Sequence, residues 1–412
     1  MWNIVLVWII ELKKRYKEKY GIDSYDIKEL VEKVGDGSDK DRYSCLMVGS
    51  YKDYRIIHYS KFNTIPSKQL KNFWTKYSGF FLECRSLVIN IKTDEIILAP
   101  YPKFFNIDEV PGWRKEEVEE KIRKAKVVYF TDKMDGSMQS YRILPDLNEL
   151  ICSGSLGMDP ELSERVRVGR KIFCSDPAYY DMCSSHPWYT FIFELIYPEI
   201  DPHVVQYPKE KWGLWLTGIR DVRDGRLLDY RETVNIAEIH GVKHIEVYRL
   251  TLEQAYSVLD KWPGSEKEGF VIGADDFRAK LKFNDFLGLQ RIVHGLFSNN
   301  IIAESVIQGT FDDLLSRLPE PLVDRAEQIR DRVVEKIVEL RGNIDKIIER
   351  VLKETREMKT LPEKLGYVTK NYKGSGVSGS IISYLKTGHY ELVKIKKEVD
   401  LDKLIHLSAL YM

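Results

Sequence analysis

A lysine followed by an aspartate–glycine pair is the most reactive feature of this chain. It lies in Thr131–Met138 (TDKMDGSM), between two segments with the pattern of strands. A lysine amine is nucleophilic only when deprotonated, and neighbouring cations or partial desolvation can lower its pKa. Such an amine can attack the α-phosphate of a nucleoside triphosphate, expel pyrophosphate and form a lysyl–nucleotide phosphoramidate. The pattern is short, and an ordinary Asp-Gly hairpin beside a solvated lysine is the alternative.

Three later segments supply groups that this reaction needs. Glu268 directly precedes a short apolar strand in EKEGFVIG, where a carboxylate can hold Mg²⁺ near phosphates. Lys280 and Lys282 alternate with apolar residues in AKLKF, so on a strand both ammonium groups point to one face, which suits an α-phosphate. Glu194 interrupts the apolar run FIFELIY, where a lone acid is costly without a partner or a function. Each segment could also be the solvent-facing part of a strand.

The segments that must position these residues form two regions of different character. Strand patterns dominate up to about residue 285, whereas from Leu322 to Val351 apolar residues recur at three- and four-residue steps, which predicts an amphipathic helix interrupted at Gly342. We therefore predict an α+β body with antiparallel sheets over 1–285 and an all-helical domain over 286–412. We predict helices over 1–35, 115–126 and 160–173, and strands over 54–59, 87–91, 95–99, 127–130, 138–143, 189–197, 212–219, 269–272 and 279–283.

The composition indicates a folded globular protein. The chain has 412 residues, 63 basic and 63 acidic side chains, and 43% apolar residues, which excludes a disordered, collagen-like or rod-like protein. Zero net charge excludes bulk basicity as a sign of nucleic-acid binding. The apolar start, Met1–Ile10, is too short to span a bilayer and lacks the features of a signal peptide. We expect a cytoplasmic protein with no membrane partner.

The end of the chain is locally basic. Between residues 359 and 397 there are eight lysines, two acids and four interleaved tyrosines. Lysines suit phosphates and tyrosines can stack on bases, so this segment could be an RNA surface. A solvated charged face with core tyrosines explains the same composition, and both interpretations stay open here.

The order Lys133, Glu194, Glu268, Lys280 and Lys282 resembles the covalent nucleotidyltransferase superfamily of DNA ligases, RNA ligases and mRNA capping enzymes. Three segments upstream of Lys133 narrow the resemblance: YRIIHY at 54–59, LECRSL at 82–87 and KFFN at 103–106. This series resembles the RNA ligase 1 family, the bacteriophage tRNA-repair ligases, whose motifs are of the kind YRIxSY, LECRG, EKFFN and KEDGS. The resemblance implies a nucleotidyltransferase (ATP-grasp-like ligase) fold followed by helices.

The resemblance also implies a role for each matching residue. Lys133 would be the adenylylated nucleophile and Glu194 would contact the nucleotide. Glu268 would bind the metal, while Lys280 and Lys282 would bind the α-phosphate. Three upstream residues would also bind ATP: Tyr59, Arg85 and Lys103. The two cations among them would lie near its β- and γ-phosphates.

One further acid matches the family, and three positions depart from it. In GTFDDL, Asp312 matches a family acid that would bind magnesium, although an aspartate at a helix N-terminus is the equal alternative. A family lysine is replaced by Ser153, the LECRG glycine by Ser86, and a tyrosine after the last lysines by Phe286.

The function implied is that of an ATP-dependent RNA ligase. Lys133 would take AMP from ATP, the AMP would pass to an RNA 5′-phosphate, and a 3′-hydroxyl would displace it, with Mg²⁺ or Mn²⁺ as the metal. The expected substrate is RNA with 5′-phosphate and 3′-hydroxyl ends, such as a nicked tRNA selected by the helical domain, in the host cytoplasm if the protein is viral. A separate polynucleotide kinase or phosphatase would heal other ends. The alternatives are a DNA ligase or capping enzyme, which would carry an OB-fold after the last lysines, and a non-catalytic RNA-binding relative.

Overall fold

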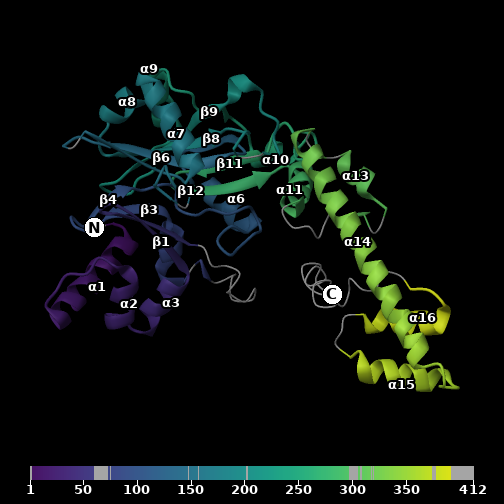
Figure 1. The fold of residues 1–412 in the computed structure, drawn as a ribbon. Coiled ribbons are helices and arrows are strands. Elements are labelled where there is room, and N and C mark those ends of the chain that lie inside the picture. The colour runs from purple at the N-terminus through teal and green to yellow at the C-terminus, as the bar shows by residue number, and fades with distance from the viewer. Residues whose placement is uncertain are drawn as a thin grey trace. The chain divides into compact units, whose positions relative to one another are not determined.

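The computed structural model describes residues 2–59, 73–74, 76–146, 148–155, 157–200, 203–296, 305–306, 309–316, 318, 320–373 and 377–390. The chain divides into two compact units, Met1–Phe286 and Leu287–Met412. Each unit is described by itself below, and both are drawn in Figure 1.

The first unit contains short helices and all of the strands in the described part of the chain. Its helices are α1 (Ile4–Tyr20), α2 (Ile27–Val34), α3 (Gly37–Ser44), α5 (Phe80–Glu83), α6 (Lys115–Lys124), α7 (Glu164–Ser175), α8 (Pro177–Ser184), α9 (Tyr230–His240) and α10 (Leu252–Tyr256), with 3-10 turns at Lys76–Gly79 and Lys209–Lys211. Its strands are β1 (Leu46–Tyr51), β2 (Tyr54–Tyr59), β3 (Arg85–Asn90), β4 (Glu95–Leu98), β5 (Val128–Lys133), β6 (Ser137–Leu144), β7 (Glu149–Ser153), β8 (Tyr189–Ile196), β9 (Gly213–Asp221), β10 (Val247–Tyr248), β11 (Gly269–Ala274) and β12 (Phe277–Lys282).

Among the described residues the strands form three four-stranded sheets, ordered β1-β2-β3-β4, β10-β5-β11-β12 and β7-β6-β8-β9. Every neighbouring pair of strands is antiparallel. The predicted α+β class with antiparallel sheets followed by helices is therefore confirmed.

Alternation along the strands explains how the first unit is layered. On β2 and β3, Ile57 and Leu87 belong to the cluster that includes the helices α1 and α2, whereas Ile56 and Val88 pack with Ile151 of the third sheet. Successive side chains of a strand point to opposite faces, so the first sheet is buried on both. The outer face of the third sheet is covered by α7, α8 and α9, and Figure 1 shows these layers.

The β11–β12 hairpin is fastened to the start of β5. Ala274 pairs with Phe277, so Asp275 and Asp276 form the turn, and Asp275 has a φ of 49°. The Asp275 carboxylate accepts hydrogen bonds from the backbone N–H groups of Lys126 at 3.1 Å and Val127 at 3.0 Å. This contact fixes the turn relative to the neighbouring strand.

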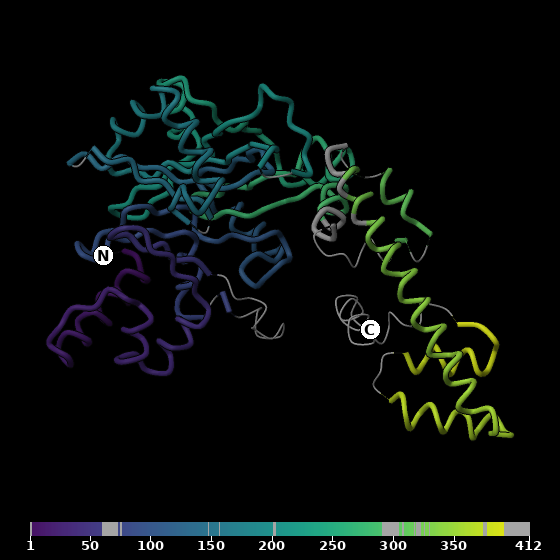
Figure 2. The backbone as a smooth tube through the Cα atoms, in the orientation of Figure 1, coloured from purple at the N-terminus to yellow at the C-terminus, as the bar shows by residue number. Residues whose placement is uncertain are grey.

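The second unit is helical throughout its described residues. Its helices are α13 (Phe311–Leu315), α14 (Glu320–Glu354), α15 (Leu361–Asn371) and α16 (Ser378–Thr387), and α11 (Asn284–Leu296) crosses the division between the units. Ile344, Ile348 and Val351 of α14 pack against Val368 and Ile381 from the two last helices. Figure 2 shows α15 and α16 beside the C-terminal end of α14.

The predicted interruption of the long helix at Gly342 is wrong. α14 runs continuously for 35 residues. A glycine inside a helix costs only about 1 kcal/mol relative to alanine, and the burial of the apolar stripe after Gly342 outweighs this cost. In the described part of the chain, no helix combines the length and apolar character needed to cross a membrane.

Candidate active site

Lys133 is the last residue of β5 and lies level with Gly269 and Lys282 across the second sheet. Gly269 of β11 pairs with Lys133 on one side and with Lys282 of β12 on the other. Glu268 comes directly before Gly269, so the register brings one carboxylate between two lysines that are distant in sequence. The Glu268 carboxylate lies 2.6 Å from Lys133 Nζ and 2.8 Å from Lys282 Nζ.

Two glycines permit this arrangement by their small size. A Cβ on Gly269 would lie 2.2 Å from the Leu281 carbonyl oxygen, and the φ of 149° also favours glycine there. A Cβ on Gly136 would lie 2.6 Å from the Leu195 carbonyl oxygen and 2.8 Å from Glu194 Cγ. Gly136 therefore lets the turn after Lys133 approach β8, the strand that carries Glu194.

The turn after Lys133 is held by the segment 203–207. The Asp135 carboxylate accepts hydrogen bonds from the backbone N–H groups of Val204 at 2.7 Å and Val205 at 3.1 Å. The backbone N–H of Asp135 donates to the Tyr207 hydroxyl at 2.7 Å. Backbone hydrogen bonds to a carboxylate are strong, so these contacts fix the turn that directly follows Lys133.

A cavity of about 260 Å³ opens beside Lys133. This volume lies just below the usual range of about 300–1,000 Å³ for small-molecule sites. Glu194 and Lys280 line it with Lys133, and Arg85 reaches it from the start of β3. Its remaining walls are largely apolar or hydroxyl-bearing, and include Tyr101, Phe104, Thr131, Met138, Thr217, Ile245 and Val271.

Three of the predicted cations lie beside aromatic rings at or near this cavity. The Arg85 guanidinium lies 5.2 Å and Lys280 Nζ lies 4.9 Å from the centre of the Phe104 ring. Lys103 Nζ lies 5.4 Å from the centre of the Tyr59 ring, and Tyr59 itself is buried. The described structure thus gathers eight of the nine predicted site residues in the first unit. The ninth, Asp312, lies in the second unit, in the first turn of the five-residue helix α13.

The pKa of Lys133 is raised, contrary to the lowering expected for a nucleophile. Burial alone would lower this pKa, but the carboxylates of Glu268 and Glu194 raise it above its ordinary value. The amine is therefore protonated in this arrangement. The pKa of Glu194 is raised as well, which for a carboxyl favours the neutral form: burial raises it to about 7, the charge of Lys133 partly opposes this, and the negative charge of Glu268 adds to it.

The cations of the site repel one another. Burial, with the nearby charge of Arg85, lowers the pKa of Lys103 to about 8. Burial and the charges of Lys133 and Arg85 lower the pKa of Lys280 well below its ordinary value. A polyanion placed among these groups would offset the repulsion and favour their charged forms. The electrostatics therefore suit a triphosphate.

Some residues around the site were not predicted from the sequence. Phe104 lies in the KFFN segment at 103–106, directly after the predicted Lys103. Thr131 and Met138 flank Lys133 in sequence, and alternation along the strands could have placed them at the cavity. Tyr207 and Thr217 carry no local signal, because only the tertiary fold brings them to Lys133.

The basic end of the chain is described only in part. Lys394, Lys396 and Lys397 lie outside the described residues. Tyr372, Tyr384 and Tyr390 pack against the apolar cluster of the second unit, which favours the interpretation of core tyrosines over base-stacking ones. Tyr367 donates a hydrogen bond to Glu354 at 2.9 Å.

Part of this chain is similar to known proteins. Residues 83–287 match the family model described as RNA ligase. A protein of Thermovibrio ammonificans named "Putative RNA ligase" is 28% identical over 192 residues, which is 46% of this chain and 46% of that protein. The match thus spans less than half the length of this curated relative.

Two solved structures show more distant similarity. An archaeal ATP-dependent RNA ligase has a TM-score of 0.44 and 12% identity, and the alignment covers 78% of this chain and 83% of the other. A variant of the Naegleria gruberi RNA ligase with ATP and Mn has a TM-score of 0.34 and 16% identity, over 42% of this chain and 55% of the other.

Proposed function

Because residues 83–287 belong to the RNA ligase family, we propose that this chain is an ATP-dependent RNA ligase that works through a lysyl–AMP intermediate. The observation that carries the proposal is the position of Lys133 at the edge of a cavity that Arg85, Glu194 and Lys280 also line. The cavity thereby brings together a lysine amine, a polar anchor for a nucleoside and several cations for phosphates.

In the first step, Lys133 Nζ attacks the α-phosphorus of ATP. The N–P bond forms, the bond from the α-phosphorus to the bridging oxygen breaks, and pyrophosphate leaves. Glu268 and Glu194 favour the protonated amine, so the ion pair with Glu268 must weaken and the proton must pass to water before the attack. Lys280 and Lys282 stabilise the charge on the α-phosphate, while Arg85 and Lys103 bind the leaving phosphates.

The donors present fit a divalent cation that binds together with ATP. Within the described residues, no group of three or more His, Cys, Asp or Glu side chains could hold a metal ion. Magnesium in phosphoryl-transfer sites, however, is usually held by one or two carboxylates together with substrate phosphates and water. We propose Glu268 for this role in the first unit. Binding of magnesium by Asp312 stays a separate prediction. A cation at Glu268 neutralises phosphate charge.

In the later steps, AMP passes to an RNA 5′-phosphate and a 3′-hydroxyl then displaces it. We propose that the helical domain, residues 286–412, selects the RNA, for example a nicked tRNA. The support is the excess of lysine between residues 359 and 397, since phosphate contacts of Lys side chains provide sequence-independent affinity.

The direct test is incubation with ATP labelled on the α-phosphate and Mg²⁺, followed by a denaturing gel. We expect a labelled band for the wild type, no band for Lys133→Ala, and loss of the band when EDTA removes the metal. A Lys267→Ala variant is a matched control, because Lys267 is the neighbouring lysine that pairs with Asp132 at 3.3 Å and is not the proposed nucleophile.

A labelled Lys133→Ala protein would show that another residue is the nucleophile. A wild type unlabelled by ATP or GTP, even after treatment with pyrophosphate, would favour a non-catalytic RNA-binding relative.

A further inference from the structure

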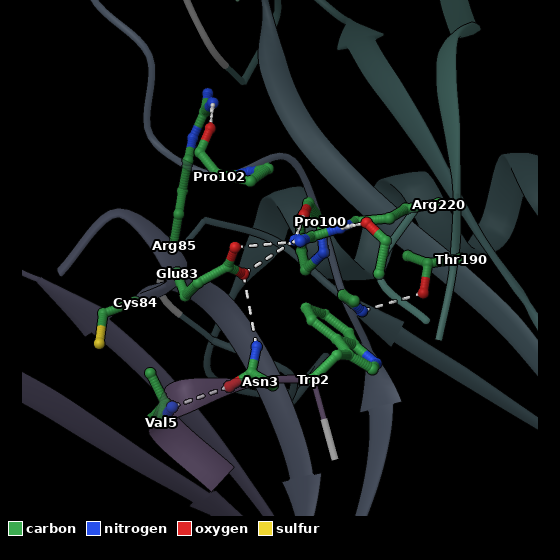
Figure 3. Close-up of polar contacts among 12 residues, drawn as sticks. Trp2, Asn3, Val5, Glu83, Cys84, Arg85, Pro100, Pro102, Thr190 and Arg220 are labelled. Atoms are coloured by element: carbon green, nitrogen blue, oxygen red, sulfur yellow. Dashed lines mark hydrogen bonds and ion pairs between the residues drawn. The ribbon is translucent and has the colours of Figure 1, made fainter. Parts of the chain in front are cut away.

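A partly buried ion pair joins α5 to the third sheet, two residues before the proposed phosphate ligand Arg85. Glu83, the last residue of α5, accepts hydrogen bonds from Arg220 of β9 through both carboxylate oxygens, at 2.9 and 3.0 Å. The two side chains are 20% and 5% exposed respectively. Two parallel hydrogen bonds between a guanidinium and a carboxylate fix relative orientation as well as distance. Figure 3 shows this pair at the centre of a polar network.

Arg220 is itself held in place from several sides. It donates to the carbonyl oxygens of Gly225 at 2.8 Å and Pro100 at 3.0 Å. The Trp2 ring lies against the guanidinium, 4.6 Å from its carbon, and the Trp2 indole N–H donates to the Val222 carbonyl at 2.9 Å. The contact with Pro100 matters for the site, because Pro100 begins the segment that leads to Lys103.

Asn3 links Glu83 to the first helix. Its amide nitrogen lies 3.4 Å from a Glu83 carboxylate oxygen, and its amide oxygen caps α1 by accepting from the N–H groups of Val5 at 3.0 Å and Leu6 at 3.2 Å. Asn3 is fully buried. One side chain therefore joins the N-terminus of α1 to the carboxylate that Arg220 holds.

The segments on either side of this network carry Arg85 and Lys103. Arg85 follows Glu83 by two residues, and its guanidinium donates to the Pro102 carbonyl at 3.5 Å. The backbone N–H of Lys103 donates to the Leu82 carbonyl at 2.7 Å. The residues before Arg85 and before Lys103 thus lie side by side, and Arg220 contacts both through Glu83 and Pro100.

We infer that Asn3, Glu83 and Arg220 form a positioning unit that sets Arg85 and Lys103 at the spacing required by the β- and γ-phosphates of ATP. This inference rests on the proposed function and adds positioning residues to it. Buried ion pairs are often no more stabilising than apolar residues of similar size, so their fixed geometry is the more informative property. Asn3 lies outside the matched residues 83–287, so this inference gives the first helix a role in the geometry of the site.

The test separates positioning from overall stability. Asn3→Asp keeps a good helix cap but places a second carboxylate against Glu83, whereas Asn3→Ser keeps a cap and removes only the donated hydrogen bond. Glu83→Gln removes the charge of the pair with little change in shape. We expect the KM for ATP in lysine adenylylation to rise about tenfold in Asn3→Asp and Glu83→Gln, and less in Asn3→Ser.

A second readout uses the joining of RNA that already carries a 5′-adenylate. That step needs no triphosphate, so we expect the three variants to perform it at nearly the wild-type rate. Asp26→Ala is the matched control, because it removes the cap of α2, whose N–H groups Asp26 binds, without touching Glu83. Parallel loss of both steps, together with a lower melting temperature, would indicate a purely structural role and overturn the inference. An unchanged KM for ATP in Asn3→Asp and Glu83→Gln would overturn it as well.

Binding of pyrophosphate alone, measured by calorimetry, keeps this test independent of catalysis. If the wild type forms no lysyl–AMP, the proposed function fails, yet pyrophosphate affinity still reports on Arg85 and Lys103. Weaker binding by Asn3→Asp and Glu83→Gln than by Asp26→Ala supports the positioning unit. Equal binding by all of them contradicts it.

Discussion

The burial of the Glu194 carboxyl group lowers the free energy of unfolding at neutral and alkaline pH. Burial raises its pKa from 4.5 to about 7. As the pH rises from about 4.5 to about 7, the unfolded chain releases this proton before the folded chain does, so the free energy of unfolding falls through this range. The contribution of Glu194 to stability is therefore present at acidic pH and lost above about pH 7.

Glu194→Gln should be more stable than the wild type at alkaline pH only. We expect its free energy of unfolding to exceed that of the wild type by up to about 3 kcal/mol near pH 8, and by little near pH 4. Denaturant unfolding at both pH values measures the difference, and lysine adenylylation by the same variant should fall. Equal stability of the two proteins at both pH values would contradict the cost of burying this carboxylate.

The sequence predicts which residue types take part in the site better than it predicts their state of charge. The Lys-x-Asp-Gly segment and the acid in FIFELIY are visible as patterns. The pKa of Lys133, in contrast, depends on Glu268, which is separated from it by 135 residues in sequence and lies 2.6 Å from it in space. Likewise, nothing near Glu83 or Arg220 in the sequence indicates that they pair.

The turn between β5 and β6 requires a residue without a side chain. Gly136→Ala should displace either this turn or β8, since the new Cβ would lie 2.6 Å from the Leu195 carbonyl oxygen. Overpacking of this kind typically costs about 1–3 kcal/mol, and we expect Lys133 adenylylation to be largely lost. Labelling with α-phosphate-labelled ATP and thermal melting measure the two effects.

Gly342→Ala is the matched substitution in the middle of α14. A Cβ there meets nothing within 4 Å, so the change should stabilise the second unit by about 1 kcal/mol and leave adenylylation unaltered. Wild-type labelling of Gly136→Ala would show that the close approach to β8 is not required.

Long periodic segments were predicted well, and short capped helices were not. The strand expected over 189–197 is β8, the strand over 279–283 is β12, and the helix expected after Leu322 is α14. The helices α3, α8 and α9 were not predicted, because their apolar spacing is weak. Each begins at an aspartate that caps its first N–H groups: Asp36, Asp176 and Asp229.

At the scale of the whole molecule, the two compact units suggest that adenylylation and RNA choice are separable. Truncation after Leu296 keeps α11 whole, including the buried Phe286. We expect this fragment to label Lys133 within about tenfold of the full chain. It should bind RNA more weakly, because phosphate contacts are removed, and should lose its preference for nicked tRNA over linear RNA, because the domain proposed to select the RNA is absent. Competition between the two RNAs measures the preference, and an unchanged preference would contradict the proposed role of the helical domain.

Alanine substitution of exposed lysines tests the same point in the full chain. Removing Lys359, Lys370 and Lys373 should weaken RNA binding and its dependence on salt. The matched control removes the same charge from the first unit, at the exposed Lys14, Lys17 and Lys28. If both triple variants lose RNA affinity equally, the lysines of the second unit have no special role.

The two-residue turn at Asp275 and Asp276 has a consequence for how this chain can change in length. Side chains along a strand alternate between the two faces of the sheet. Inserting or deleting one residue between the turn and Gly269 would therefore move Glu268 to the opposite face. Both lysines would then lose their shared carboxylate, although the hairpin itself could still form. Asp275 also binds the start of β5, so a longer turn would have to preserve that attachment. Related sequences should therefore vary little in length from 268 to 282, and insertions should collect outside this hairpin.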